Sequence, residues 1–100
     1  MKYNKLIRDK IPDILKEKGI KYKIRFADSK EYWEKLKEKL AEEVKEFSQS
    51  ENIEEMADIL EVIDAICAHK EFDKKKLQAV KNQKSSERGG FEKRIILEES

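Results

Sequence analysis

The residues of this chain best suited to chemistry are carboxylates that occur three residues apart in two stretches. The first stretch, KLAEEVKE, contains Glu43 and Glu46, and the second, EEMADIL, contains Glu55 and Asp58. Residues three apart lie side by side on a helix, so each pair can share one ligand. Oxygen atoms from two such pairs suit a hard divalent ion such as Mg²⁺ or Mn²⁺.

Each pair also lies where an amphipathic helix should be apolar. With about 100° per residue, Glu43 falls inside the apolar arc of its helix and Glu46 at the edge of that arc. Glu55 falls inside the apolar arc of the second helix, which Asp58 borders. The two helices are therefore expected to direct carboxylates at the surface along which they pack. The arcs are formed by Trp33, Leu36, Leu40, Val44 and Phe47, and by Ile59, Val62 and Ile66.

Ionised carboxylates in a packing surface need compensation, because the idealised cost of desolvating one such ion is of order 20 kcal/mol. The compensation can be protonation of the carboxylates or a cation placed among them. Lysine side chains can also neutralise them by reaching over apolar surface. Two matched pairs on consecutive helices favour a metal ion over these alternatives.

The elements that must position these pairs are predicted to be helices. Pro12 in a first turn and Gly19 after a last turn mark a short helix. The capping box that begins at Asp28 opens the first long helix, and the polar residues 48–50 separate it from the second. The expected helices cover residues 9–18, 28–47, 51–69 and 73–86.

Two short strands are also predicted, one near each end of the chain. Residues 20–26 alternate strictly between apolar and polar side chains, which is typical of a half-buried strand. Residues 91–97 follow a turn at Gly89 and Gly90. The two strands can pair within the chain or across a dimer. The predicted fold is mainly α, a helical bundle with a small two-stranded β accessory, in a single domain over residues 1–100.

Length and composition exclude several classes of function. One hundred residues match one compact domain. Charged residues make up 45% of the chain, but 23 basic and 22 acidic residues nearly cancel. That balance is unlike a disordered chain or a dedicated nucleic-acid binder. No apolar run approaches the roughly 20 residues that span a bilayer, no signal peptide is visible, and the single Cys67 fits a reducing compartment. We expect a cytoplasmic protein that binds neither nucleic-acid polymers nor membranes.

The EExxE motif followed by ExxD resembles the all-α nucleoside triphosphate pyrophosphohydrolase superfamily. This superfamily includes MazG-like proteins, dimeric dUTPases and phosphoribosyl-ATP pyrophosphohydrolase. The flanking stretches YNKLIRDKIP (residues 3–12) and KSSERGGF (residues 84–91) resemble the compact MazG-like subgroup often labelled phosphoribosyl-ATP pyrophosphohydrolase-like. The four motifs occur in the expected order over nearly the whole chain. The resemblance implies a MazG-like helical bundle.

The resemblance also implies a role for each motif residue. Glu42 would bind a second ion or activate the attacking water, and Glu43 would share in catalysis. The ligands of Mg²⁺, for which Mn²⁺ can substitute, would be Glu43, Glu46, Glu55 and Asp58. The residues expected to meet substrate phosphates are Lys84 and Arg88, together with Lys5, Arg8 and Lys10. Trp33 is a further candidate, for stacking on a nucleotide base.

The implied activity is Mg²⁺-dependent hydrolysis between the α- and β-phosphates of a nucleoside triphosphate, giving a nucleoside monophosphate and pyrophosphate. A house-cleaning enzyme of this kind is one possibility, and a phosphoribosyl-ATP pyrophosphohydrolase is another within the same class. The alternative from a different class is a catalytically silent helical module that binds nucleotides or a partner protein. Two long helices with wide apolar arcs in so short a chain also indicate a homodimer or homotetramer with four-helix packing.

Overall fold

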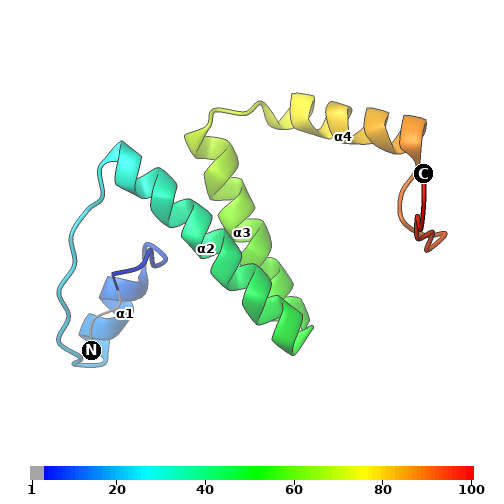
Figure 1. Ribbon diagram of the computed structural model, residues 1–100. Coiled ribbons are helices and arrows are strands. Elements are labelled where there is room, and N and C mark those ends of the chain that lie inside the picture. Colours follow the sequence, from blue (N-terminus) through cyan, green and yellow to red (C-terminus); the bar gives the residue numbers. More distant parts are fainter. Residues whose placement is uncertain (1–3) are drawn as a thin grey trace.

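The computed structural model of the protein describes residues 4–100, and residues 1–3, which include the first residue of the YNKLIRDKIP motif, lie outside it. The described chain forms four helices (Figure 1). They are α1 (Ile11–Glu17), α2 (Ser29–Ser50), α3 (Ile53–His69) and α4 (Lys74–Arg88). The prediction of a mainly helical fold is confirmed. None of the helices in residues 4–100 is both long and apolar enough to cross a membrane.

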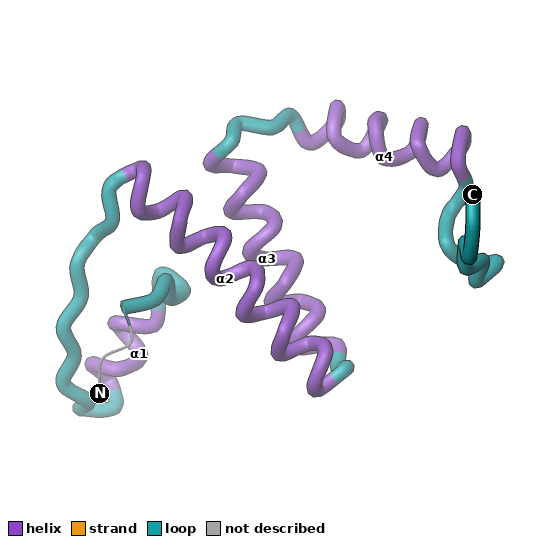
Figure 2. The backbone as a smooth tube through the Cα atoms, viewed as in Figure 1, coloured by secondary structure: helices purple, strands orange, loops and turns teal. Residues whose placement is uncertain are grey.

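The centre of the molecule is a hairpin of α2 and α3, which pack side by side along most of their length (Figures 1 and 2). Its small core consists of apolar side chains from the facing surfaces of the two helices. Burial of such side chains from water is the main force that holds two helices together. The buried apolar residues are Leu36, Ile59, Val62 and Cys67.

Three helices begin at side-chain caps that the sequence provides. The carboxylate of Asp28 accepts a hydrogen bond from the backbone N–H of Glu31 at 2.8 Å, and Asn52 and Asp73 cap α3 and α4 in the same way. Such caps satisfy N–H groups that have no partner within the helix. The predicted break at residues 48–50 is wrong, since α2 continues to Ser50. The chain turns instead at Glu51, which has the left-handed φ of 54°.

The predicted β accessory does not form within residues 4–100. Residues 20–26 and 91–97 have no strand pairing (Figure 2). A strand needs a neighbour for its backbone N–H and C=O groups, and the two segments lie at opposite ends of the molecule (Figure 1). The prediction of pairing within the chain is therefore wrong, because α4 carries the C-terminal segment away from the N-terminal one.

The single chain is elongated. Its radius of gyration is 17.9 Å, whereas about 13 Å is usual for a compact chain of 100 residues. Helix α4 projects from the hairpin and leaves Leu77 and Val80 exposed (Figure 1). Large apolar side chains of α3, including Ile53 and Leu60, are also exposed. The chain thus leaves unburied much of the apolar surface that its sequence provides.

Replacing Leu36 by alanine is expected to destabilise the hairpin strongly. Leu36 is the most completely buried large side chain, with 1% of its surface exposed, and loss of a buried leucine costs about 2–5 kcal/mol of unfolding free energy. Urea unfolding followed by circular dichroism measures the change. Leu77→Ala is the matched control, and we expect a change within about 0.5 kcal/mol at that exposed site. Equal effects of the two substitutions would contradict the placement of the core.

Candidate metal centre

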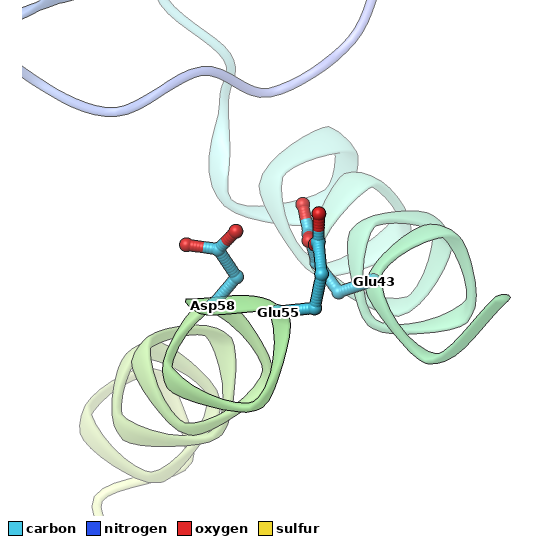
Figure 3. Close-up of side chains that lie close together, drawn as sticks. All are labelled: Glu43, Glu55 and Asp58. Carbon is cyan, nitrogen blue, oxygen red and sulfur yellow. The ribbon is translucent and has the colours of Figure 1, made fainter. Parts of the chain in front are cut away.

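Three of the predicted carboxylates meet on one side of the hairpin. Glu43 of α2 and Glu55 and Asp58 of α3 each offer one oxygen atom, and these atoms all lie within 4.8 Å of one another. Figure 3 shows the three side chains leaving the two helices and ending close together. We call these three residues the acidic triad.

The hairpin itself brings the triad together. Glu43 lies two turns before the end of α2, and Glu55 and Asp58 lie in the first two turns of α3. The helices are joined by a short connection at Glu51 and Asn52, so residues near this connection face each other. The side chain of Asn52 accepts a hydrogen bond from the N–H of Glu55 at 2.9 Å, which fixes the start of α3 at the triad.

Glu43 is the most informative member of the triad. It is the one buried charged residue within residues 4–100, with 6% of its surface exposed. Its Oε2 atom is buried and has no hydrogen-bond partner in the described chain, and the same holds for Oε2 of Glu55. A buried carboxylate oxygen without a partner is costly. The two free oxygen atoms are therefore placed to accept a ligand.

The electrostatics of the triad favour neutralisation. Burial raises the pKa of Glu43 above its ordinary value, and the nearby charge of Glu46 adds to the effect, although Lys39 opposes it. The pKa of Glu55 is raised by partial desolvation first and then by the charges of Glu46 and Asp58. Both shifts arise because several carboxylates share a partly dry site.

The donor set fits a hard divalent cation. All three side chains present carboxylate oxygen atoms, which are the ligands that Mg²⁺ and Mn²⁺ prefer. A bound cation would partner the free oxygen atoms of Glu43 and Glu55 and would remove the repulsion that raises their pKa values. Of the predicted ligands, Glu43, Glu55 and Asp58 are the ones that the structure brings together.

Glu46 and Glu42 lie beside the triad and outside it. The charge of Glu46 acts on both Glu43 and Glu55, but its oxygen atoms do not join the cluster. Glu42 is held by two lysines, with Oε1 at 3.1 Å from Nζ of Lys5 and Oε2 at 3.3 Å from Nζ of Lys39. Partial burial raises the pKa of Glu42, but the two lysines outweigh it and leave the pKa below its ordinary value.

The chain supplies cations to the triad itself. Nη2 of Arg8 lies 2.7 Å from Oδ1 of Asp58. Nζ of Lys39 lies 3.5 Å from Oε1 of Glu43. Each of these cations touches one triad residue, and neither reaches the free oxygen of Glu43 or of Glu55.

A groove runs from the triad along the hairpin toward the start of α2. Its volume is about 440 Å³, which is within the usual range for small-molecule sites. Residues 6–10 of the N-terminal segment form one wall, and the facing sides of α2 and α3 form the other. The lining contains both charged and apolar residues. The groove is lined by residues 6–10 and by Tyr32, Leu36, Lys39, Glu43, Asp58, Glu61, Val62 and Ala65.

The predicted phosphate-binding residues fall into two groups. Lys5 pairs with Glu42 beside the triad, Arg8 pairs with Asp58 of the triad, and Lys10 lines the groove. Lys84 and Arg88 lie on α4, which points away from the hairpin (Figure 1). The single chain therefore does not bring Lys84 and Arg88 to the triad.

Trp33 lies outside the groove, and its ring is already covered. It stacks on the ring of His69 with centroids 5.7 Å apart, and Nζ of Lys70 lies 4.0 Å from the Trp33 ring centroid. Its neighbour Tyr32 lines the groove instead. The structure thus does not bring Trp33 to the triad, and stacking of Trp33 on a base stays a prediction.

Sequence reasoning missed two residues of the site. Lys39 lies four positions before Glu43, and a search for opposite charges at this helical spacing would have found it. Tyr32 belongs to none of the sequence motifs. Its place in the groove depends on the path of the N-terminal segment, for which the sequence carries no clear signal.

Comparison of the chain with protein-family models, with curated proteins and with solved structures gives no match.

The raised pKa values predict how the stability of the metal-free protein depends on pH. The folded-state pKa of Glu43 lies above its value in the unfolded chain, about 4.3, so protonation of Glu43 stabilises the fold. This contribution is fully present below the unfolded pKa and is lost as pH rises through the folded pKa. Glutamine cannot titrate, so Glu43→Gln removes this pH-dependent contribution. As pH rises from the unfolded to the folded pKa of Glu43, the unfolding free energy of the variant should therefore increase relative to that of wild type.

Urea titrations in EDTA at a series of pH values measure this difference. Glu34→Gln is the control, since Glu34 is exposed on α2 and pairs only with Lys37 among the described residues. A difference between Glu43→Gln and wild type that does not change with pH would contradict the raised pKa.

Proposed function

We propose that the protein is a Mg²⁺-dependent nucleoside triphosphate pyrophosphohydrolase that cleaves between the α- and β-phosphates. The observation that carries the proposal is Glu43, a buried carboxylate with an unpartnered oxygen atom, which clusters with Glu55 and Asp58. An enzyme for phosphate esters and anhydrides needs mainly charge neutralisation and alignment. An acidic site beside a groove edged with Arg8 and Lys10 offers both.

The family assignment remains part of this proposal. It rests on the order of four motifs, namely YNKLIRDKIP, EExxE, ExxD and KSSERGGF, in a chain of four helices. The helical hairpin that carries EExxE and ExxD is what a MazG-like bundle requires. We therefore propose membership of the all-α pyrophosphohydrolases, in the phosphoribosyl-ATP pyrophosphohydrolase-like subgroup, and a place in the cytoplasm.

The proposal assigns a separate role to each group of residues at the site. Glu43, Glu55 and Asp58 would hold Mg²⁺, with Glu46 as a fourth carboxylate beside them. When bound, the ion supplies charge neutralisation of the phosphates and a more acidic attacking water. Glu42, which Lys5 and Lys39 keep ionised, is the carboxylate beside the triad that would accept a proton from the attacking water. Arg8 and Lys10 bind phosphate oxygens. One water is consumed, and the products are a nucleoside monophosphate and pyrophosphate.

We also propose that the working form is a homodimer or a pair of such dimers. Ile53, Met56, Leu60 and Ile63 form an exposed stripe on α3 with spacings of three and four residues, the pattern of helices that pack in bundles. Two hairpins joined along this stripe would form a four-helix bundle.

The ends of the chain fit the same assembly. Residues 20–26 and 91–97 keep exposed apolar side chains and would find strand partners in a second copy. In such a dimer Lys84 and Arg88 of one copy can serve the phosphate groups bound by the other, which the single chain does not allow.

The test is pyrophosphate release from a panel of nucleoside and deoxynucleoside triphosphates and phosphoribosyl-ATP, with Mg²⁺, Mn²⁺ or EDTA. We expect release that depends on the metal, and the preferred compound names the substrate class. Binding of Mg²⁺-nucleotide without release would identify a silent binding module instead. Absence of both metal binding and release would reject the proposed function.

A further inference from the structure

Arg8 occupies a position that a metal ion at the acidic triad would contest. Its Nη2 atom donates a hydrogen bond to Oδ1 of Asp58 at 2.7 Å, although the two residues are 50 positions apart in the sequence. The oxygen atoms of Glu43, Glu55 and Asp58 lie within 4.8 Å of one another. An ion held by all three would therefore lie close to the guanidinium group.

Two cations at this distance repel each other. A guanidinium group stays charged at every physiological pH, so Arg8 cannot yield by losing its proton. A divalent ion that interacts with all three carboxylates has a more favourable electrostatic energy there than Arg8, which contacts only Asp58 among the three. The metal is thus expected to win the competition for Asp58.

The segment that carries Arg8 has room to move. Residues 4–10 have no regular secondary structure. Residues 6–9 line the groove beside the triad, and they also line a second cavity of about 390 Å³. A segment with open space on both sides can reorient a side chain without repacking a core. Figure 3 shows a blue N-terminal stretch passing above the triad, on the side where the carboxylates end.

A second ion pair, between Lys5 and Glu42, holds residues 4–10 against α2 while Arg8 moves. Nζ of Lys5 pairs with Oε1 of Glu42 at 3.1 Å, and Glu42 lies outside the triad. Metal binding at the triad leaves this ion pair intact. Arg8 would therefore stay over the groove after leaving Asp58, with its guanidinium group free for another anion.

We propose that Arg8 is an internal counter-cation of the triad, which the metal displaces from Asp58 and which then binds the phosphates of the nucleotide. The inference rests on the proposed function and adds an order of events to it. Metal binding comes first and releases the guanidinium group that phosphate binding needs. Arg8 thus lowers the affinity for the metal when the nucleotide is absent, and it raises the affinity for the nucleotide when the metal is bound.

The first test is the affinity for Mn²⁺ without nucleotide, measured by electron paramagnetic resonance on wild type and Arg8→Gln. We expect Arg8→Gln to bind Mn²⁺ up to about fivefold more tightly, because the metal then no longer has to break the exposed ion pair between Arg8 and Asp58. Arg25→Gln is the matched control. It removes the same charge from a guanidinium group that pairs with Glu31 at 2.6 Å. Glu31 lies in the first turn of α2, about 18 Å along the helix from Glu43, so Arg25→Gln should change the affinity less than twofold.

The second test adds the nonhydrolysable α,β-methylene ATP at saturating Mn²⁺. Here Arg8→Gln should bind the nucleotide about tenfold more weakly, because a charge-assisted pair with phosphate is lost. Arg8→Lys should recover part of that affinity. Circular dichroism confirms that each variant is folded. Arg8→Gln should thus strengthen Mn²⁺ binding in the first measurement and weaken nucleotide binding in the second.

The outcomes separate this inference from the proposed function. Wild type that binds Mn²⁺ and releases pyrophosphate, with an Arg8→Gln affinity for Mn²⁺ equal to or weaker than wild type, overturns the role of Arg8 alone. Unchanged nucleotide affinity in Arg8→Gln also overturns it. Wild type that binds no Mn²⁺ overturns both the inference and the metal-dependent function on which it rests.

Discussion

Glu55→Gln is expected to lower the rate of pyrophosphate release at least about a hundredfold while the protein remains folded. The substitution keeps the size of the side chain but removes one of the three anionic ligands of the triad. Loss of a metal or of transition-state charge stabilisation commonly costs two or more orders of magnitude in rate. Steady-state assays of pyrophosphate with Mg²⁺, on the best substrate of the panel, measure the loss.

Glu54→Gln is the control for this experiment. Glu54 is the preceding residue on α3, is exposed, and is not part of the triad, so the variant should keep wild-type activity within about twofold. Equal activity of Glu55→Gln and wild type would remove the triad from the catalytic machinery. Equal loss in both variants would indicate damage to the start of α3, which circular dichroism would reveal.

Leu60→Asp is expected to dissociate the proposed dimer. Leu60 lies in the middle of the exposed stripe of α3, with 56% of its surface exposed in the single chain. A charge buried between two helices without a partner costs several kcal/mol, and each 1.4 kcal/mol weakens association tenfold. A weakening of at least about a hundredfold follows. Sedimentation velocity over a range of concentrations measures it.

Ile14→Asp is the matched control for Leu60→Asp. Ile14 of α1 is an apolar side chain with 41% of its surface exposed, and it lies outside the stripe. This variant should keep the wild-type association state. A wild-type protein that sediments as a monomer at micromolar concentration would refute the dimer itself.

The helices could be predicted because their signals are local. Asp28 followed three residues later by Glu31 forms a cap, and Asp28 does accept the hydrogen bond that the pattern requires. The end of α2 could not be placed, because polar residues such as Ser48 and Ser50 do not by themselves stop a helix. The turn comes at Glu51, whose left-handed φ of 54° is unusual for a residue with a side chain and is not encoded by a glycine.

The triad could be predicted because charge on an apolar arc is visible on a helical wheel. The wheel placed Glu43 and Glu55 toward the partner helix, and the structure brings both together with Asp58. It could not show that Glu46 stays outside the cluster, since this depends on the register of α2 against α3.

The strands and the contact between Arg8 and Asp58 lie beyond such patterns. Alternation in residues 20–26 indicates a side that could be buried, but a strand forms only where a partner supplies hydrogen bonds. Arg8 reaches Asp58 across 50 positions of sequence. No local rule for spacing or propensity addresses a contact at that separation.

The position of the triad at the closed end of the hairpin has a consequence for how the protein folds and varies. Glu55 and Asp58 follow Glu43 by only twelve and fifteen positions, so the centre is built from contacts of low sequence separation. Such contacts form early, because little chain entropy is lost in closing a short loop. The ligand geometry is therefore set before α4 and the terminal segments find their places. Changes in α4 and in residues 91–97 can therefore accumulate while the arrangement of the acidic triad stays intact.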